Sequence, residues 1–172
     1  MRSEGIRRIT GLPYQHKRLN ILYLYILQHG DAESKEVNPE RPLSEQGLRD
    51  IRLLALHMQN VGVRLSHIFH SGKRRAEQTA RLIADNIPPG IVPVQTKGLM
   101  PNDDPAAIVG DIESLQENIL IVSHMPFVSR LCSLLLTGAA TDAFASVPGT
   151  LICLEQAEGK WRLAYMIRPA FL

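Results

Sequence analysis

The sequence contains little of what marks disulfide-rich or membrane-spanning proteins. Its 172 residues include only two cysteines, too few for the disulfide framework of a small secreted domain. Both Cys132 and Cys153 lie within apolar segments, so we expect buried thiols. The apolar run at residues 21–27 is far shorter than the roughly 18 residues that a membrane span needs, and no small-residue cleavage site follows it. We therefore expect a cytoplasmic protein.

Metal-binding spacings are also missing from the sequence. The chain has no His-x-His pair and no other tight cluster of ligand residues. We therefore expect an activity that needs neither a cofactor nor a metal ion. A metallohydrolase site built from His29, Asp31, His124 and Asp103 is the alternative, and activity that survives EDTA would exclude it.

Charge is small overall and uneven along the chain. The formal net charge is +2, which gives no indication of nucleic-acid binding. Residues 1–20 hold five basic residues and one acidic residue, a balance of +4, and show no apolar periodicity. We predict that they form a basic, poorly ordered extension in front of one domain that spans residues 21–172.

Short apolar runs alternate with helical patterns along this domain. The alternation favours a mostly parallel sheet that helices cover on both faces, closed by a hairpin across Glu158-Gly159. The expected fold class is α/β, a three-layer α/β/α sandwich with a mostly parallel mixed central sheet. The expected strands are residues 21–27, 67–70, 91–94, 118–122, 150–155 and 161–167, and the expected helices are residues 45–60, 74–86, 105–115 and 126–137.

Three of the expected strands run directly into polar segments. These segments are QHGD at 28–31, SGKRR at 71–75 and SHMP at 123–126. Because ligands of open α/β sheets bind outside the carboxyl ends of the strands, we expect the three segments to share one crevice. A guanidinium and the free N–H groups of a helix N-terminus suit an anion. The predicted ligand is phosphate.

Two histidines in one crevice allow two kinds of phosphate chemistry. A neutral imidazole can attack phosphorus and carry the phosphoryl group. It can instead donate a proton and stabilise charge on the phosphoryl oxygens. Taken alone, His29 would more often be a satisfied core histidine, so the other motifs of the chain decide between these interpretations.

Four motifs in order resemble those of a known family. They are QHGDA at 28–32, RPLSEQG at 41–47, HSGKRRAEQTA at 70–80 and VSHMP at 122–126. Together they resemble the histidine phosphatase superfamily, also called the phosphoglycerate mutase-like family, from residue 21 to the end. The short spacing between them is most similar to SixA-type phosphohistidine phosphatases. The resemblance implies a phosphoglycerate mutase-like fold, His29 as the nucleophile, Arg75 as a phosphate ligand and His124 as the second histidine of the pocket.

One residue departs from the family pattern. Gln28 stands where members usually have arginine, so a neutral amide replaces a permanent cation beside the phosphate. We still expect Gln28 to contact phosphate. Gly30 would let the chain turn past the ligand.

Four further residues are candidates for the site. Ser71 lies near it but is equally a turn or cap residue, and Arg41 belongs to a motif that family members carry near the mouth of the site. Asn102 and Asp103 occupy the region where relatives place an acidic proton donor, although the pattern here suits turn and capping residues equally well.

The weak evidence for an acid favours one class of substrate. A phosphomonoester leaves as an alkoxide and needs a proton, whereas phosphohistidine leaves as an imidazole and needs much less help. The leading hypothesis is a phosphatase that removes phosphate from phosphohistidine in a protein through a phospho-His29 intermediate. A small-molecule phosphomonoesterase and a non-catalytic phosphate-binding module, suggested by Gln28, are the alternatives. We expect neither nucleic acid nor a membrane as a partner.

Overall fold

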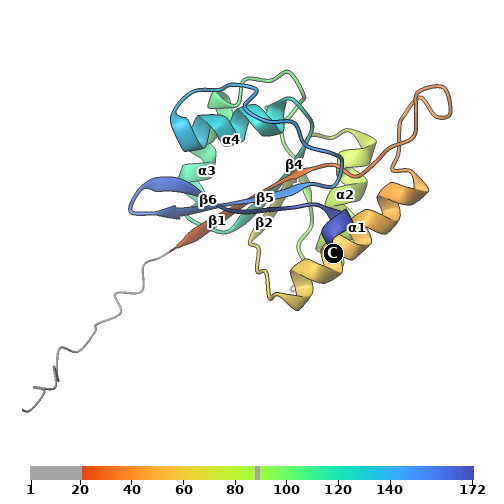
Figure 1. Ribbon diagram of the computed structural model, residues 1–172, viewed down its shortest axis with the longest axis horizontal. Coiled ribbons are helices and arrows are strands. Elements are labelled where there is room, and N and C mark those ends of the chain that lie inside the picture. The colour runs from red at the N-terminus through yellow and green to blue at the C-terminus, as the bar shows by residue number, and fades with distance from the viewer. Residues whose placement is uncertain (1–20, 88–89) are drawn as a thin grey trace, which may run out of the picture.

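A six-stranded mixed sheet with helices on both faces forms the molecule (Figure 1). The computed structural model describes residues 21–87 and 90–172, so the predicted basic extension lies outside the described residues. The α/β architecture predicted from the sequence is confirmed. The strands are β1 (Leu22–Gln28), β2 (His67–His70), β3 (Val94–Gln95), β4 (Ile119–Ser123), β5 (Leu151–Ala157) and β6 (Lys160–Ile167). The helices are α1 (Glu45–Asn60), α2 (Arg74–Ala84), α3 (Ala106–Leu115), α4 (Phe127–Thr137) and a short 3₁₀ turn, η1 (Pro169–Phe171).

The strand order explains why the apolar run of β1 is continuous rather than alternating. The order is β3-β2-β4-β1-β5-β6, which places β1 near the middle of the sheet. Leu24 and Ile26 of β1 pack into a core with α3 and α4, while Tyr25 and Leu27 pack into a second core with α1 and α2. A strand buried on both faces needs apolar residues at every position.

Parallel pairing brings the carboxyl ends of three strands together. β1 and β2 both pair with β4 in parallel, with Gln28 opposite Ser123 and His70 opposite Val122. β5 runs antiparallel to β1, and β6 antiparallel to β5. The three polar segments that follow β1, β2 and β4 therefore leave the sheet at the same edge.

Local signals in the sequence account for the ends of α1. The hydroxyl of Ser44 accepts a hydrogen bond from the Gly47 N–H at 3.0 Å and so caps the first turn. After Asn60 the chain turns at Gly62, whose φ of 73° favours glycine. The predicted bounds of this helix are confirmed.

Two predicted elements differ from the structure. The strand expected at residues 91–94 is wrong, because only Val94 and Gln95 pair with β2, and Pro93 has no N–H to donate to a ladder. The helix expected to reach residue 86 ends at Ala84, after which Asp85 and Asn86 form a turn.

The closing hairpin and the two thiols match the expectations. Glu158 and Gly159 have φ values of 54° and 73° between β5 and β6, as a two-residue hairpin turn of the primed type requires. Cys132 and Cys153 are free and buried, in the two different cores. In the two described stretches of the chain, no helix combines the length and hydropathy needed to cross a membrane.

Candidate active site

The histidines that follow β1 and β4 lie side by side at the carboxyl edge of the sheet, with their ring planes tilted by 57°. Their ring centroids are 4.8 Å apart. The pairing of Gln28 with Ser123 sets this distance, because each histidine is the next residue on its strand. The prediction that the two segments meet is confirmed by this geometry.

Hydrogen bonds fix the tautomer of His29. Its Nδ1 lies 2.7 Å from the carbonyl oxygen of Gly30, and its Nε2 lies 2.9 Å from the Nε of Arg75. A carbonyl can only accept and a guanidinium can only donate, so the proton of the neutral ring is on Nδ1. Nε2 therefore presents a lone pair toward Arg75.

Electrostatics keep His29 uncharged at neutral pH. Its pKa is lowered to about 4, chiefly by burial. The Gly30 carbonyl, the next largest influence, raises the pKa, the positive charges of Arg75 and Arg41 lower it, and Asp31 raises it. A neutral imidazole at pH 7 is the form that a nucleophile requires.

His124 is even more deeply enclosed and has a different set of contacts. Its side chain is only 2% exposed, and its Nε2 lies 2.6 Å from the hydroxyl of Ser71. Its pKa is lowered to about 3, chiefly by burial and then by the neighbouring His29 and by the charges of Arg75, Lys73 and Arg41. Its other nitrogen, Nδ1, is buried and has no hydrogen-bond partner within the described residues.

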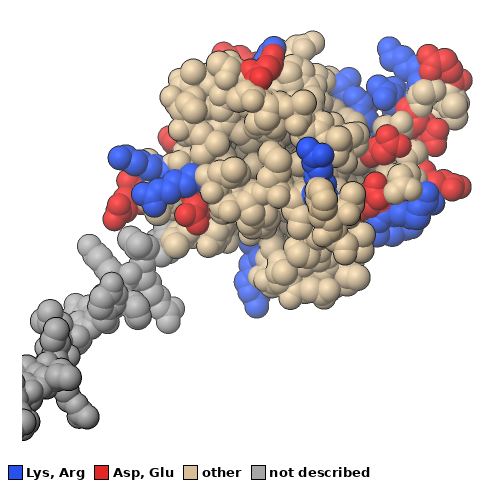
Figure 2. Space-filling view, viewed as in Figure 1, with Lys and Arg blue, Asp and Glu red and all other residues tan. Residues whose placement is uncertain are grey.

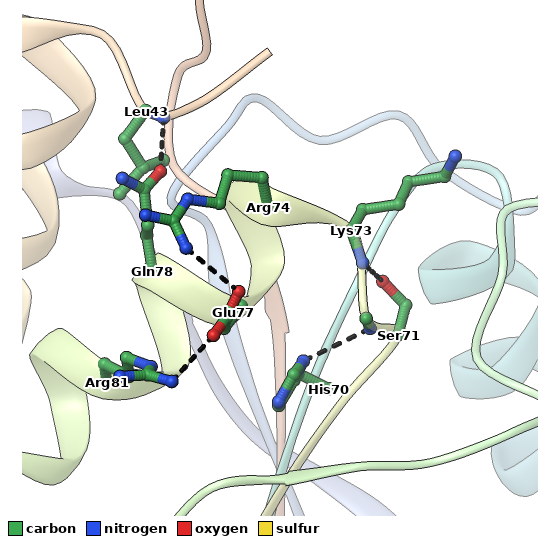
Figure 3. Close-up of polar contacts among 9 residues, drawn as sticks. Leu43, His70, Ser71, Lys73, Arg74, Glu77, Gln78 and Arg81 are labelled. Atoms are coloured by element: carbon green, nitrogen blue, oxygen red, sulfur yellow. Dashed lines mark hydrogen bonds and ion pairs between the residues drawn. The ribbon is translucent and has the colours of Figure 1, made fainter. Parts of the chain in front are cut away.

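The start of α2 supplies the basic side of the site. Burial and the charge of Arg41 lower the pKa of Arg75, whose side chain lies against His29. Its neighbour Arg74 is exposed and pairs with Glu77, as a solvated residue does (Figure 3). The positive charge of Lys73, the residue before the helix, lowers the pKa of His124.

Residues of the RAEQT stretch brace the loop after His29. The hydroxyl of Thr79 accepts from the Gly30 N–H at 3.1 Å and donates to the Arg75 carbonyl at 2.7 Å. The Oε1 of Gln78 accepts from the Leu43 N–H at 2.7 Å (Figure 3). This motif therefore links α2 to the segment that carries His29, a role that the sequence pattern did not reveal.

Glycine at position 30 is required by packing, and its backbone is not in the left-handed region that favours glycine. A Cβ there would lie 2.7 Å from the Cγ1 of Ile51 and 3.0 Å from Leu43. The carbonyl of Gly30 is the group that holds His29 Nδ1. The close contacts explain why a residue without a side chain stands here. That Gly30 lets the chain turn past the ligand, or contacts phosphate, stays a prediction.

The RPLSEQG motif folds back onto the residue that follows Gly30. Ser44 donates to the carboxylate of Asp31 at 2.6 Å, and a Cβ on Gly47 would collide with the Asp31 carbonyl. Arg41, at φ 50°, donates through Nε to the Glu33 carbonyl at 3.0 Å. Its charge lowers the pKa of both histidines, which places Arg41 near the site.

The side chain of Gln28 contacts other residues of the same chain rather than open space. It is buried, 7% exposed, and its carboxamide contacts the hydroxyl of Ser146. With the nitrogen facing the acceptors around it, the amide donates to Ser146 and also to the Val147 carbonyl at 3.1 Å. The expected phosphate contact stays a prediction. The contact spans 118 positions of the chain, so no local pattern could have indicated it.

The candidate acids have local roles. The carboxylate of Asp103 accepts from the Met100 N–H at 2.9 Å, and that of Asp104 accepts from the Ala106 N–H at 2.9 Å. Asn102 is exposed. These are the turn and capping contacts that the sequence also suggested, and a general-acid role for Asn102 or Asp103 stays a prediction. Across residues 21–87 and 90–172, no group of three or more metal-ligating side chains lies close enough to hold an ion.

Comparison with known proteins agrees with the motifs. Residues 24–100 match the model of the histidine phosphatase superfamily (branch 1). This part of the chain, which includes His29 and Arg75, therefore carries the sequence signature of the histidine phosphatase superfamily. Phosphohistidine phosphatase SixA of Escherichia coli strain K12 is 26% identical over 147 residues, which are 79% of this chain and 88% of SixA.

Solved structures of the superfamily share the fold. The protein histidine phosphatase SixA complexed with tungstate has a TM-score of 0.78 at 22% identity, over 87% of this chain and 99% of that one. Phosphoglycerate mutase from Bacillus anthracis strain Sterne has a TM-score of 0.68 at 13% identity, over 89% and 96%. The fold of this histidine phosphatase domain is therefore phosphoglycerate mutase-like, as the motifs predicted.

Proposed function

We propose that the protein is a phosphatase in which His29 takes the phosphoryl group from phosphohistidine in a protein and carries it as phospho-His29. One observation carries the proposal. The Nδ1–H of His29 is held by the Gly30 carbonyl while its Nε2 lone pair faces the guanidinium of Arg75. An uncharged nucleophile next to a cation is what attack on a phosphoryl group needs.

The first step follows from these contacts. Arg75 moves its N–H groups from His29 Nε2 to the phosphoryl oxygens, which frees the lone pair. The Nε2–P bond forms while the P–N bond to the substrate histidine breaks. The substrate ring reacts in the form protonated on its other nitrogen, so that it keeps the electron pair of the broken bond and leaves as neutral imidazole. The ring of His29 then becomes positively charged, and the Gly30 carbonyl stabilises that charge through Nδ1–H.

Hydrolysis of the intermediate completes the cycle. A water oxygen attacks phosphorus, the Nε2–P bond breaks, and its electron pair returns to Nε2. The proton lost by water goes to solvent or to the inorganic phosphate that is released. His29 is again neutral with its proton on Nδ1, ready for the next substrate.

The surroundings of the site favour phosphohistidine over a phosphomonoester. The carboxylates of Asp103 and Asp104 are bonded to nearby backbone N–H groups, and an imidazole leaving group needs little help from an acid. The 26% identity with a phosphohistidine phosphatase points the same way.

Nucleic acid and membranes are not part of the proposal. On the face drawn in Figure 2, acidic and basic side chains intermix at the edges and most of the middle is uncharged. On this face neither sign forms a continuous stripe of the kind that nucleic-acid binding uses. The location that we propose, the cytoplasm, rests on the sequence expectation.

One observation favours the alternative of a phosphate-binding module without turnover. Gln28 replaces the usual arginine, and its carboxamide is already bonded to Ser146, so it adds no charge to the phosphate pocket. Such a module would bind oxyanions through Arg75 but would form no phospho-His29.

A turnover assay separates these functions. Phosphate release from a phosphohistidine-containing protein is compared with release from a panel of phosphomonoesters, in the presence of EDTA, for wild type and His29→Ala. We expect turnover of the phosphohistidine protein that EDTA does not affect and that His29→Ala loses. Preference for an ester would indicate the small-molecule phosphomonoesterase, and binding without turnover would indicate the module.

A further inference from the structure

A buried serine contacts the second histidine from a different strand. Ser71 follows β2, His124 follows β4, and they are 6% and 2% exposed. The Ser71 hydroxyl oxygen lies 2.6 Å from His124 Nε2. A hydrogen bond between two enclosed groups is protected from water and therefore constrains both side chains.

The surroundings of Ser71 decide which way this hydrogen bond runs. The backbone N–H of Lys73 points at the Ser71 hydroxyl oxygen at 3.4 Å and can only donate (Figure 3). The hydroxyl accepts there, and its only other hydrogen-bond partner among the described residues is His124 Nε2. Its single proton is therefore paired only if the hydroxyl donates to His124. Nε2 of His124 then accepts, and the proton of the neutral ring lies on Nδ1.

The same nitrogen is the one that lacks a partner. Nδ1 of His124 is buried without a hydrogen bond inside the described part of the chain. Buried donors are rarely left unpaired in folded proteins. With the His29 ring centroid 4.8 Å away, a phosphoryl group that reaches His29 brings oxygen atoms to the neighbourhood of this donor.

We propose that Ser71 is a positioning residue that holds His124 in the Nδ1–H tautomer, so that a neutral His124 donates a hydrogen bond to an oxygen of the bound phosphoryl group. The identity of that group rests on the function proposed above. The displacement of Arg75 from His29 Nε2, which nucleophilic attack requires, is also the movement that admits the oxygen to Nδ1.

This arrangement gives His124 a role without proton transfer. Burial, His29, Arg75, Lys73 and Arg41 all lower the pKa of His124, which is about 3. The ring therefore stays uncharged while it stabilises negative charge on the phosphoryl oxygens. A donor of this kind acts through a preorganised hydrogen bond, and it leaves the leaving group unprotonated, as an imidazole leaving group allows.

The tautomer can be measured without any turnover. Long-range ¹H–¹⁵N spectra of the ¹⁵N-labelled full chain distinguish a protonated from an unprotonated ring nitrogen, and His29 serves as the internal reference. We expect His124 to carry its proton on Nδ1 in wild type. Tungstate should shift the Nδ1 signal of His124 and leave the Nε2 signal nearly unchanged.

Substitution of the serine tests its part in the arrangement. In Ser71→Ala we expect His124 to place its proton on Nε2 for much of the time and kcat to fall about tenfold. Ser71→Thr, which keeps the hydroxyl, should restore the Nδ1–H tautomer and most of the rate. Ser133→Ala is the matched control, because Ser133 is also buried and donates to the Ala139 carbonyl at 2.8 Å, away from the histidines.

The outcomes separate this proposal from the proposed function. A proton on Nε2 of His124 in wild type would overturn the proposal, whatever the protein hydrolyses. An unchanged tautomer and rate in Ser71→Ala would remove Ser71 from its role, and an Nδ1 signal insensitive to saturating tungstate would remove the phosphoryl contact. The expected tautomers in a protein that turns over no phosphohistidine would leave the proposal standing and contradict the proposed function.

Discussion

The segments after β1 and β4 each present a histidine to the same site, and they hold it in different ways. His29 is fixed by the carbonyl of the next residue, Gly30. His124 is fixed by a side chain, Ser71, that comes from another strand. The first contact is built into the turn itself, whereas the second depends on how three strands are ordered in the sheet.

Because of this difference, an acceptor nitrogen remains on the ring of His29, whereas the nitrogen that remains on His124 is the one that we assign as a donor. On His29 the nitrogen that remains is Nε2, an acceptor with a lone pair, which Arg75 covers. On His124 the nitrogen that remains is Nδ1, buried without a partner. Two histidines only 4.8 Å apart are therefore not interchangeable, and we assign the nucleophile to the first and the hydrogen-bond donor to the second.

Removal of the first histidine should have the largest effect. We expect His29→Ala to lose phosphohistidine hydrolysis by at least about a thousandfold, because no other group can carry the phosphoryl. Its melting temperature should change little, since the ring is not part of either core. His67→Ala, a change in a half-exposed histidine paired with Glu117, is the control. Turnover that survives in His29→Ala would contradict the covalent route.

Removal of the second histidine should have a smaller effect. We expect His124→Ala to lower kcat by about a hundredfold, as for one preorganised donor. His124→Asn keeps an N–H near the position of Nδ1 and should recover part of that loss. Rates equal to wild type in both variants would show that the ring after β4 has no part in the reaction.

Loss of the guanidinium should weaken binding of every tetrahedral oxyanion. We expect Arg75→Ala to raise the Kd of phosphate, vanadate and tungstate together by about tenfold or more, and Arg75→Lys to restore only part, because a point charge lacks two-pronged geometry. Arg74→Ala removes the adjacent, exposed cation and should change these constants little.

The Arg75→Ala variant also tests the electrostatic effect of Arg75 on His29. Arg75 lowers the pKa of His29, so Arg75→Ala should raise that pKa above its value of about 4. An NMR titration of the His29 ring measures the change. An unchanged pKa together with unchanged oxyanion binding would place Arg75 outside the site.

The glutamine at the end of β1 should have the smallest effect on binding. Because its buried carboxamide is bonded to Ser146, we expect Gln28→Ala to lower the free energy of unfolding by about 1–3 kcal/mol. Ser146→Ala should cost a similar amount, and neither should change the Kd of tungstate more than about twofold. A large loss of tungstate affinity in Gln28→Ala alone would instead support the phosphate contact predicted from the sequence.

Patterns that are local in the sequence predicted most of the fold. The capping hydroxyl of Ser44, the continuous apolar run of β1 and the turn at Glu158-Gly159 each depend on residues that are close together in the sequence. The helix, the strand and the hairpin that they belong to could therefore be predicted. The two-residue strand β3 was misplaced, because pairing with β2 rather than any apolar pattern determines where it lies.

Only the site residues that belong to recognisable motifs could be predicted from the sequence. His29, Arg75 and His124 follow strand ends or begin a helix, and the parallel order of the strands was enough to bring them together. The contacts of Ser71 with His124 and of Gln28 with Ser146 join residues 53 and 118 positions apart. Such pairs depend on tertiary packing, which the spacing of residues in a single sequence does not reveal.

Trapping of the intermediate tests the central claim most directly. The enzyme is mixed with a phosphohistidine-containing protein, quenched in alkali within a single turnover, digested and examined by mass spectrometry. We predict a phosphoryl group on the peptide that contains His29, stable in alkali, lost in acid and absent from His29→Ala. Full phosphate release with no phosphorylated His29 at any time point would contradict the account.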